Sequence, residues 1–169
     1  MEPKKNGLCC VIVGGTGSGK STFAREKFIN PYRKTGQNIE CFDVNAEHGF
    51  DEPKEDFLEW LVRVKKSKNS LIFCEESTIF LNGYSGSDTH IKQLLVSKRH
   101  RSNNVLFIFH SFNALPNWLI SFADYITIFE TPDKLETVKK KFPDNEKVHA
   151  AFLKIKSGKK YDNITIKLR

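Results

Sequence analysis

Short apolar runs alternate along this chain with longer stretches in which apolar residues recur at helical spacing. The short runs are rich in β-branched and aromatic residues and are bounded by polar or glycine-containing segments, a pattern that predicts strands. Six strands are expected, at 8–13, 38–44, 70–74, 105–109, 124–129 and 163–168.

Helices are expected between these strands. The segment 21–29 follows a glycine-rich stretch and is predicted to end before Pro31, because proline disrupts a helix interior. The other helices are expected at 51–66, with Phe57, Leu58, Leu61 and Val62 on one face, around Ile91, Leu94 and Leu95, and from Thr131 and Pro132 onward. In the last of these, threonine would cap the helix and proline would fit its first turn.

Alternation of strand and helix with continuously apolar strands predicts a mostly parallel sheet covered by helices on both faces, a three-layer α/β fold. In such folds ligands bind beyond the carboxyl ends of the strands, which here are followed by 14–21, 43–47, 75–76 and 110–111. No repeat, low-complexity linker or break in composition divides the chain, so residues 1–169 are expected to form a single domain.

The segment Gly14–Ser21 fills every fixed position of the phosphate-binding pattern G-x-x-x-x-G-K-[ST] and stands between a predicted strand and a predicted helix. Backbone N–H groups and the positive end of the helix then point at a polyphosphate. Lys20 is expected to reach the β- and γ-phosphates of ATP, Ser21 to ligate Mg²⁺ and Thr22 to approach the α-phosphate. The predicted nucleotide-binding residues are Gly15, Thr16, Gly17, Ser18, Gly19, Lys20, Ser21 and Thr22. An ordinary glycine-rich turn is the alternative, and the flanking strand and helix argue against it.

A second motif follows the third predicted strand. Four apolar residues and two acids at 71–76 look like a Walker B segment. Glu75 is expected to hold Mg²⁺, usually through water, because hard oxygen ligands suit that ion. Glu76 is expected to act as the catalytic base that polarises the attacking water. Glutamate at the first acid is a departure, since aspartate is usual there.

Composition and charge indicate the compartment in which the protein is expected and the kind of partner that it could bind. Hydrophobic residues make up 39% and charged residues 28% of the chain, and no apolar run has the length of a transmembrane segment, so a cytoplasmic protein is expected. The four cysteines lie in predicted strands without metal-ligand spacing, which favours reduced thiols. A net charge of +7 permits binding to the backbone phosphates of DNA, although the lysine clusters would also suit solvated helix ends.

With these motifs in view, the chain resembles the FtsK–HerA superfamily of ring-forming P-loop ATPases, and within it the genome-packaging ATPases of membrane-containing icosahedral viruses. The resemblance covers most of the chain. It rests on the two motifs, the acidic turn at 43–47, the basic stretch at 97–104 before an apolar strand, and the strand at 122–129.

That resemblance implies a sheet in which 105–109 lies between the Walker A and Walker B strands. His110 would then occupy the place of a polar sensor, often glutamine in the family, and reach the γ-phosphate or the attacking water. Members of this class complete the site with an arginine from a neighbouring subunit, for which Arg99 and Arg101 are the candidates and Arg33 a third. Surface or DNA-phosphate contacts are the alternative role for all three arginines.

The function implied is ATP hydrolysis with Mg²⁺ that drives DNA translocation, as in viral genome packaging. The resemblance further implies a homo-oligomeric ring of five or six copies, a capsid or membrane protein as partner, and a place in the host cytoplasm or with the virion. Two alternatives stay open, a P-loop kinase of nucleotides or other small molecules and a non-catalytic nucleotide-dependent switch. The kinase alternative lacks an arginine-rich lid that would enclose its substrate.

Overall fold

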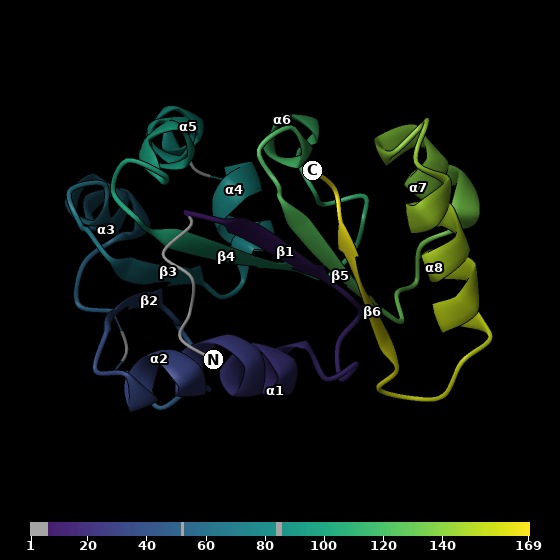
Figure 1. Ribbon diagram of the computed structural model, residues 1–169, viewed down its shortest axis with the longest axis horizontal. Coiled ribbons are helices and arrows are strands. Elements are labelled where there is room, and N and C mark those ends of the chain that lie inside the picture. Colours follow the sequence, from purple (N-terminus) through teal and green to yellow (C-terminus); the bar gives the residue numbers. More distant parts are fainter. Residues whose placement is uncertain (1–6, 52, 84–85) are drawn as a thin grey trace.

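A computed structural model describes residues 7–51, 53–83 and 86–169. Its centre is a twisted sheet with the strand order β2-β3-β4-β1-β5-β6 (Figure 1). The strands are β1 (Cys9–Val13), β2 (Asn38–Phe42), β3 (Ser70–Cys74), β4 (Asn104–Phe109), β5 (Tyr125–Phe129) and β6 (Asn163–Lys167). All neighbours pair in parallel except β5 and β6, which are antiparallel. The six predicted strands are therefore confirmed, with ends that differ by at most two residues.

The strand order confirms that β4 lies between β1, which leads into the glycine loop, and β3, which leads into the acidic pair. In the register, Val13 pairs with Phe109 and Cys74 with Phe107. The carboxyl ends of these three strands consequently meet at one edge of the sheet, where the predicted motifs follow them.

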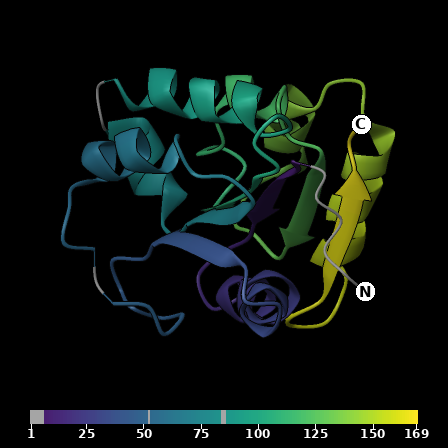
Figure 2. The same ribbon diagram turned by 60° about the vertical axis from the view of Figure 1, so that its left-hand side comes forward.

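Helices cover both faces of the sheet, as Figure 2 shows for the helices after the glycine loop and for α5 on the opposite side. The helical segments are α1 (Lys20–Ala24), η1 (Arg25–Ile29), α2 (Asn30–Lys34), α3 (Phe57–Val64), α4 (Ser77–Gly83), α5 (Ser87–Ser97), α6 (Asn117–Ile120), α7 (Leu135–Lys141) and α8 (Glu146–Lys156). Helices α7 and α8 pack near the β6 edge (Figure 1). These layers confirm the predicted three-layer α/β class.

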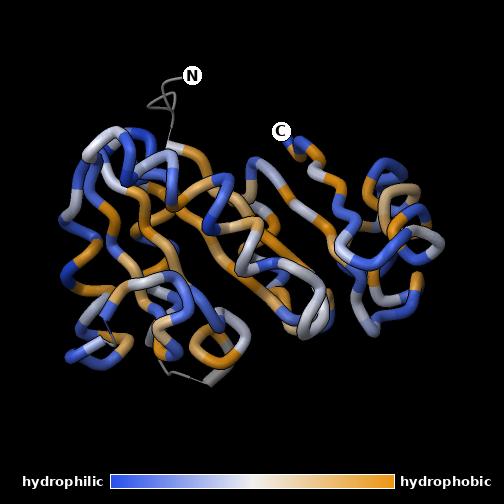
Figure 3. Tube along the Cα trace, turned by 90° about the horizontal axis from the view of Figure 1, so that it is seen from below, coloured by the Kyte–Doolittle hydropathy of each residue, from blue (hydrophilic) through white to orange (hydrophobic). Residues whose placement is uncertain are grey.

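Two apolar clusters fill the spaces between the layers. On one face Ile12 of β1 packs in a cluster with Ile29, and on the other face Val11 shares a cluster with Trp60 of α3 and Leu94 of α5. Hydrophobic residues accordingly run along the central strands, while the outer turns carry many hydrophilic ones (Figure 3). Two buried faces explain why the strands are continuously apolar rather than alternating.

The helix after the glycine loop does not end before Pro31, so that prediction was wrong. Helix α1 continues through the π-helical turn η1 into α2, and Pro31 lies in the first turn of α2. A π turn bonds each N–H five residues back, which relieves the clash between a proline ring and the carbonyl four residues before it. Proline therefore marks a change of helical pitch here and not a stop.

The helix predicted at 51–66 begins later and ends earlier, at Phe57 and Val64. Asp56 caps it, accepting a hydrogen bond from the N–H of Glu59 while the Glu59 side chain accepts one from the N–H of Asp56. The predicted apolar face was also wrong in part, because Trp60 and Val64 are buried with Phe57 and Leu61, whereas Val62 is 40% exposed. Residue 52, in the predicted helix, lies outside the described residues.

Thr131 and Pro132 do not open a helix, and α7 begins only after Lys134. The Thr131 hydroxyl donates instead to Asp133, whose carboxylate also accepts from the N–H of Phe112 at 2.7 Å. This turn therefore joins the segment after β5 to the loop after β4, and the threonine serves the side chain of Asp133 rather than a helix N-terminus.

The cysteines are all free thiols, as predicted. Cys9 and Cys74 are buried, and Cys10 and Cys41 are half-buried. Burial raises the pKa of the Cys74 thiol to about 12, which keeps it protonated and unreactive. Across the described part of the chain, every helix is too short or too polar to cross a bilayer.

Candidate active site

A cavity of about 330 Å³ opens at the carboxyl edge of the sheet. It brings together the residues predicted for nucleotide chemistry from both motifs and from the end of β4. The lining consists of Thr16, Gly17, Gly19, Lys20, Ser21, Thr22, Glu47, Glu75, Glu76, His110 and Tyr161. Of the predicted nucleotide-binding set, Gly15 and Ser18 line a neighbouring cavity of about 800 Å³, which shares Thr16, Gly17 and His110 with the first.

The ends of two strands position the glycine loop through backbone hydrogen bonds. Gly14 N–H donates to the carbonyl of Phe109 at 3.0 Å, and Gly15 N–H donates to that of Glu130 at 2.7 Å. A Cβ on Gly14 would lie 2.6 Å from Cβ of Phe129, and Gly19 adopts a φ of 98° directly before α1. Both positions therefore require glycine, one for close approach and one for backbone conformation.

Lys20 is buried at the start of α1, with 5% of its surface exposed. Its ammonium donates to the carbonyl of Gly15 at 2.7 Å. Burial lowers the pKa of Lys20, and the negative charges of Glu75 and Glu76 act in the opposite direction. A cation enclosed in this way interacts strongly with a polyphosphate because little water screens it.

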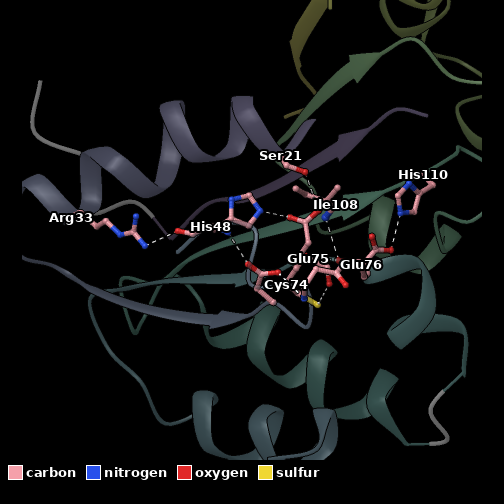
Figure 4. A network of polar contacts seen from close by, with 11 residues as sticks. Ser21, Arg33, His48, Cys74, Glu75, Glu76, Ile108 and His110 are labelled. Atoms are coloured by element: carbon pink, nitrogen blue, oxygen red, sulfur yellow. Dashed lines mark hydrogen bonds and ion pairs between the residues drawn. The ribbon is translucent and has the colours of Figure 1, made fainter. Parts of the chain in front are cut away.

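Glu75 is held at both of its carboxylate oxygens. Oε1 lies 3.4 Å from the hydroxyl of Ser21, and Oε2 lies 2.7 Å from Nε2 of His48 (Figure 4). The side chain is only 3% exposed. One oxygen therefore faces the glycine loop while the other is fixed by an imidazole.

His48 connects Glu75 to the loop after β2. Its N–H donates to the buried carboxylate of Asp43 at 3.0 Å, and its carbonyl accepts from Arg33 at 2.8 Å. The imidazole packs edge-on against Phe73, with ring centroids 4.8 Å apart. The predicted acidic turn thus lies at the site, with Asp43 shaping the turn that places His48.

Glu76 turns away from Glu75 and toward the end of β4. Its backbone has a φ of 53°, and its Oε2 lies 2.8 Å from Nε2 of His110. The N–H of His110 donates to the hydroxyl of Thr78 at 3.2 Å, which fixes the residue above α4. The two adjacent acids therefore contact different partners, an arrangement suited to separate roles.

Arg99 and Arg101 lie at the amino ends of the strands, opposite the cavity. Arg99 approaches Asp124 at 3.5 Å, and that carboxylate also pairs with Lys98 and accepts from the N–H of Cys9. Arg101 donates to the carbonyl of Lys66 at 3.0 Å. Neither arginine meets the cavity of its own chain, so a catalytic role remains a prediction that requires a second copy.

Arg33, the third candidate, is engaged near its own site. It donates to the carbonyls of His48 and Gly49 and stacks over the ring of Phe50 at 4.5 Å. In this structure Arg33 therefore stabilises the turn that contains His48.

Two residues of the site escaped the sequence patterns: His48, which contacts Glu75, and Tyr161, which lines the cavity. His48 follows the acidic turn, and the acids around it could have drawn attention to it. Tyr161 lies in the turn between α8 and β6, where nothing in the local sequence signals contact with the glycine loop.

Glu47, His48 and Glu75 could together hold a metal ion, since each offers one ligand atom and these atoms lie within 4.8 Å of one another. Ser21 adds a hydroxyl beside Glu75. These three oxygen donors and one imidazole could bind a divalent cation. They suit a hard ion such as Mg²⁺ less well than a set of oxygen ligands alone would.

The strand order, the glycine loop and the acidic pair define the P-loop nucleotide-binding class with one strand between the Walker A and Walker B strands. No protein-family model matches the chain, and no curated protein matches it by sequence.

Solved structures place the fold more narrowly within this class. The chain is similar to B204, the DNA-packaging ATPase from Sulfolobus Turreted Icosahedral Virus, with a TM-score of 0.77 and 17% identity over 97% of this chain and 94% of that one. It is also similar to the genome packaging NTPase B204 from Sulfolobus turreted icosahedral virus 2 in complex with AMP (TM-score 0.74, 19% identity, 98% and 94% covered). The complex of that protein with ATP-gammaS gives a TM-score of 0.74 at 18% identity, again over 98% and 94%. The predicted resemblance to viral packaging ATPases is thereby confirmed in the fold.

Proposed function

We propose that this chain hydrolyses ATP to drive DNA translocation in the packaging of a viral genome. One observation carries the proposal: the glycine loop, both acids and His110 meet in one cavity. The fold that produces this cavity is the fold of the viral packaging ATPases, over nearly the whole length of both chains.

Mg²⁺ belongs to this proposal, with Ser21 and Glu75 as the residues that hold it. Ser21 Oγ and Glu75 Oε1 are 3.4 Å apart and face the same cavity, which fits a cation bound by the hydroxyl and, through water, by the carboxylate. His48 occupies the other Glu75 oxygen and thereby directs Oε1 toward Ser21. When bound, the ion would neutralise charge on the β- and γ-phosphates.

The remaining residues supply binding and proton transfer. Lys20 exchanges its bond to the Gly15 carbonyl for the β- and γ-phosphates of ATP. Glu76 accepts a proton from the attacking water, whose oxygen bonds to the γ-phosphorus as the bond to the bridging oxygen breaks, releasing ADP and phosphate. His110, bonded to Glu76 at 2.8 Å, orients that carboxylate and lies within the same cavity to contact the γ-phosphate.

An arginine from a neighbouring copy completes the proposed site. Arg99 and Arg101 cannot serve their own cavity, and both lie on an accessible edge with Arg99 68% exposed on its side chain. A ring of five or six copies would bring such an arginine to the next cavity, where it would stabilise charge on the transferred phosphoryl group.

The wider setting is part of the same proposal. The net charge of +7 supports contact with DNA through its backbone phosphates. We place the protein in the host cytoplasm or with the virion, with residues 1–169 acting as one ATPase domain and a capsid or membrane protein as docking partner.

ATP turnover by the assembled protein, measured with and without duplex DNA, tests the proposal. We expect DNA to stimulate release of free phosphate, and Glu76→Gln to lower turnover by about 10²–10⁴-fold while ATP stays bound. Glu136→Gln, an exposed acid on α7, is the matched control and should leave turnover unchanged.

Other outcomes separate the two alternatives. Phosphate transferred to a nucleoside or nucleotide, rather than released, would assign the chain to the kinases. A Glu76→Gln variant that behaves like the unaltered protein, with no hydrolysis in either, would assign it to the switches.

A further inference from the structure

A second cavity of about 500 Å³ adjoins the first beside α1. The two share Gly19, Thr22 and Tyr161 in their linings, so they lie side by side between the acids and the amino end of β6. Neither motif accounts for this second chamber, whose lining includes Glu26, Phe129 and Asn163.

Aromatic rings form the walls of this chamber. Phe129 is buried and packs edge-on against Phe23, with ring centroids 5.5 Å apart. Tyr161 stands opposite the loop with 57% of its surface exposed. A Cβ on Gly19 would lie 3.2 Å from Cδ1 of Tyr161, so the tyrosine ring directly borders the phosphate-binding loop.

Tyr161 is held in an unfavourable backbone conformation. Its φ is 73°, which costs a non-glycine residue free energy and is common where a side chain has a binding role. Asp162 fixes the turn, since its carboxylate accepts from the N–H of Lys159 at 2.8 Å and its own N–H donates to the Lys159 carbonyl at 3.0 Å. Lys160 lies 5.0 Å above the tyrosine ring. The turn therefore presents an exposed ring in a fixed place instead of burying it.

Polar groups stand at the edge of the chamber. Asn163 begins β6 opposite Phe129 of β5, and Glu26 projects from the helix above. The asparagine amide offers a donor and an acceptor side by side, which match the amino group and ring nitrogen along the edge of adenine. Glu26 offers a further acceptor for an amino group.

We propose that this chamber holds the adenine base of the nucleotide whose phosphates the glycine loop binds. The base stacks on Tyr161 against the wall formed by Phe129, and Asn163 contacts its edge. Thr22, which lines both cavities, lies beside the α-phosphate and ribose between them. This inference rests on nucleotide binding in the proposed function and assigns the residues that distinguish ATP from other triphosphates.

The test is to titrate the full chain with ATP, CTP and inorganic tripolyphosphate and to measure each affinity. Tripolyphosphate has no base, so it reports on the glycine loop alone. Tyr161→Ala should weaken ATP binding about 10-fold and leave tripolyphosphate binding unchanged, because loss of stacking affects only the base. Tyr161→Phe keeps the ring and should bind ATP like the unaltered protein, and Asn163→Ala should reduce the preference for ATP over CTP. Leu153→Ala, an exposed apolar residue on α8 outside both cavities, serves as the control.

Unchanged ATP affinity in Tyr161→Ala would overturn the inference. Equal weakening of ATP and tripolyphosphate would also overturn it, since Tyr161 would then act on the loop and not on a base. If the unaltered chain bound neither ligand, the proposed nucleotide site itself would be wrong, which is a separate outcome from failure of the base chamber.

Discussion

At the scale of single residues, the two acids after β3 are adjacent in sequence but differ in what holds them. Glu75 is buried between Ser21 and His48, whereas Glu76 faces His110 from a backbone with positive φ. The sequence pattern predicted a division of roles between the two acids. The structure adds the partners that could produce it.

His48 is expected to orient Glu75 toward the cation. His48→Ala should lower the apparent affinity for Mg²⁺ in the presence of ATP about 10–100-fold, because residues that orient a metal ligand have effects of this size. Titration of Mg²⁺ against bound ATP measures it. His149→Ala, on α8 with its ring bonded to the Phe142 carbonyl, is the control. An unchanged Mg²⁺ dependence would remove His48 from the site.

The buried charge of Lys20 is expected to lower the free energy of unfolding of the ligand-free protein. Burial lowers its pKa below the unfolded value, so protonation costs the folded state free energy at neutral pH. Lys20→Met should therefore raise Tm at pH 7, and the difference should shrink as the pH rises through the lowered pKa, where the native lysine becomes neutral. Thermal unfolding from pH 7 to pH 10 measures this. A lower Tm for Lys20→Met at pH 7 would contradict the assignment.

At the scale of elements, the four central strands could be predicted closely because their apolar runs have one explanation, burial on both faces. Helix ends could not, because they depend on local hydrogen bonds and helical pitch that the apolar pattern does not show. Pro31 continues a helix through a π turn, and Thr131 bonds to Asp133 rather than capping α7. Helix α8 was missed although Val148, Ala151, Phe152 and Ile155 show the spacing of a buried face.

The capping box of α3 gives a prediction at this scale. Asp56→Ala should lower the free energy of unfolding by about 1 kcal/mol, the usual effect of losing such a cap. That loss corresponds to a Tm about 2–4 °C lower in a chain of this size. Asp144→Ala, an exposed aspartate outside any helix, should change Tm little. Equal Tm values for the two variants would mean that α3 does not depend on its cap.

The candidate site was predictable where a motif specifies both residue type and place. Gly14–Ser21 and the acids at 75–76 fall together because parallel strands end at one edge. His48 and Tyr161 could not be predicted in this way. His48 reaches Glu75, and Tyr161 reaches the cavity, from turns whose positions depend on the whole sheet.

At the scale of the whole molecule, Arg99 and Arg101 lie away from the cavity of their own chain, so the catalytic role proposed for them requires a neighbouring copy. Removing Arg99 should cost little stability, because its side chain is 68% exposed and the buried carboxylate of Asp124 keeps Lys98 as a partner. Arg99→Ala combined with Arg101→Ala should lower turnover of the assembled protein about 10³-fold or more while ATP binding persists.

Mixing variants distinguishes a shared site from a local one. The double arginine variant keeps an intact cavity, and Lys20→Met keeps intact arginines. Assemblies of both should recover part of the turnover that each lacks alone. Arg25→Ala, an exposed arginine on η1, is the control and should remain active by itself. Absence of recovery in mixed assemblies would contradict the contribution of a neighbouring copy.

Binding of ATP to the purified chain in magnesium buffer tests the central claim most directly. The account predicts saturable binding that Lys20→Met weakens about 10–100-fold, since hydrogen bonds from a charged group contribute about 1.5–3 kcal/mol. If the protein with Lys20 intact showed no measurable affinity for ATP, the cavity at the carboxyl edge would not be a nucleotide site.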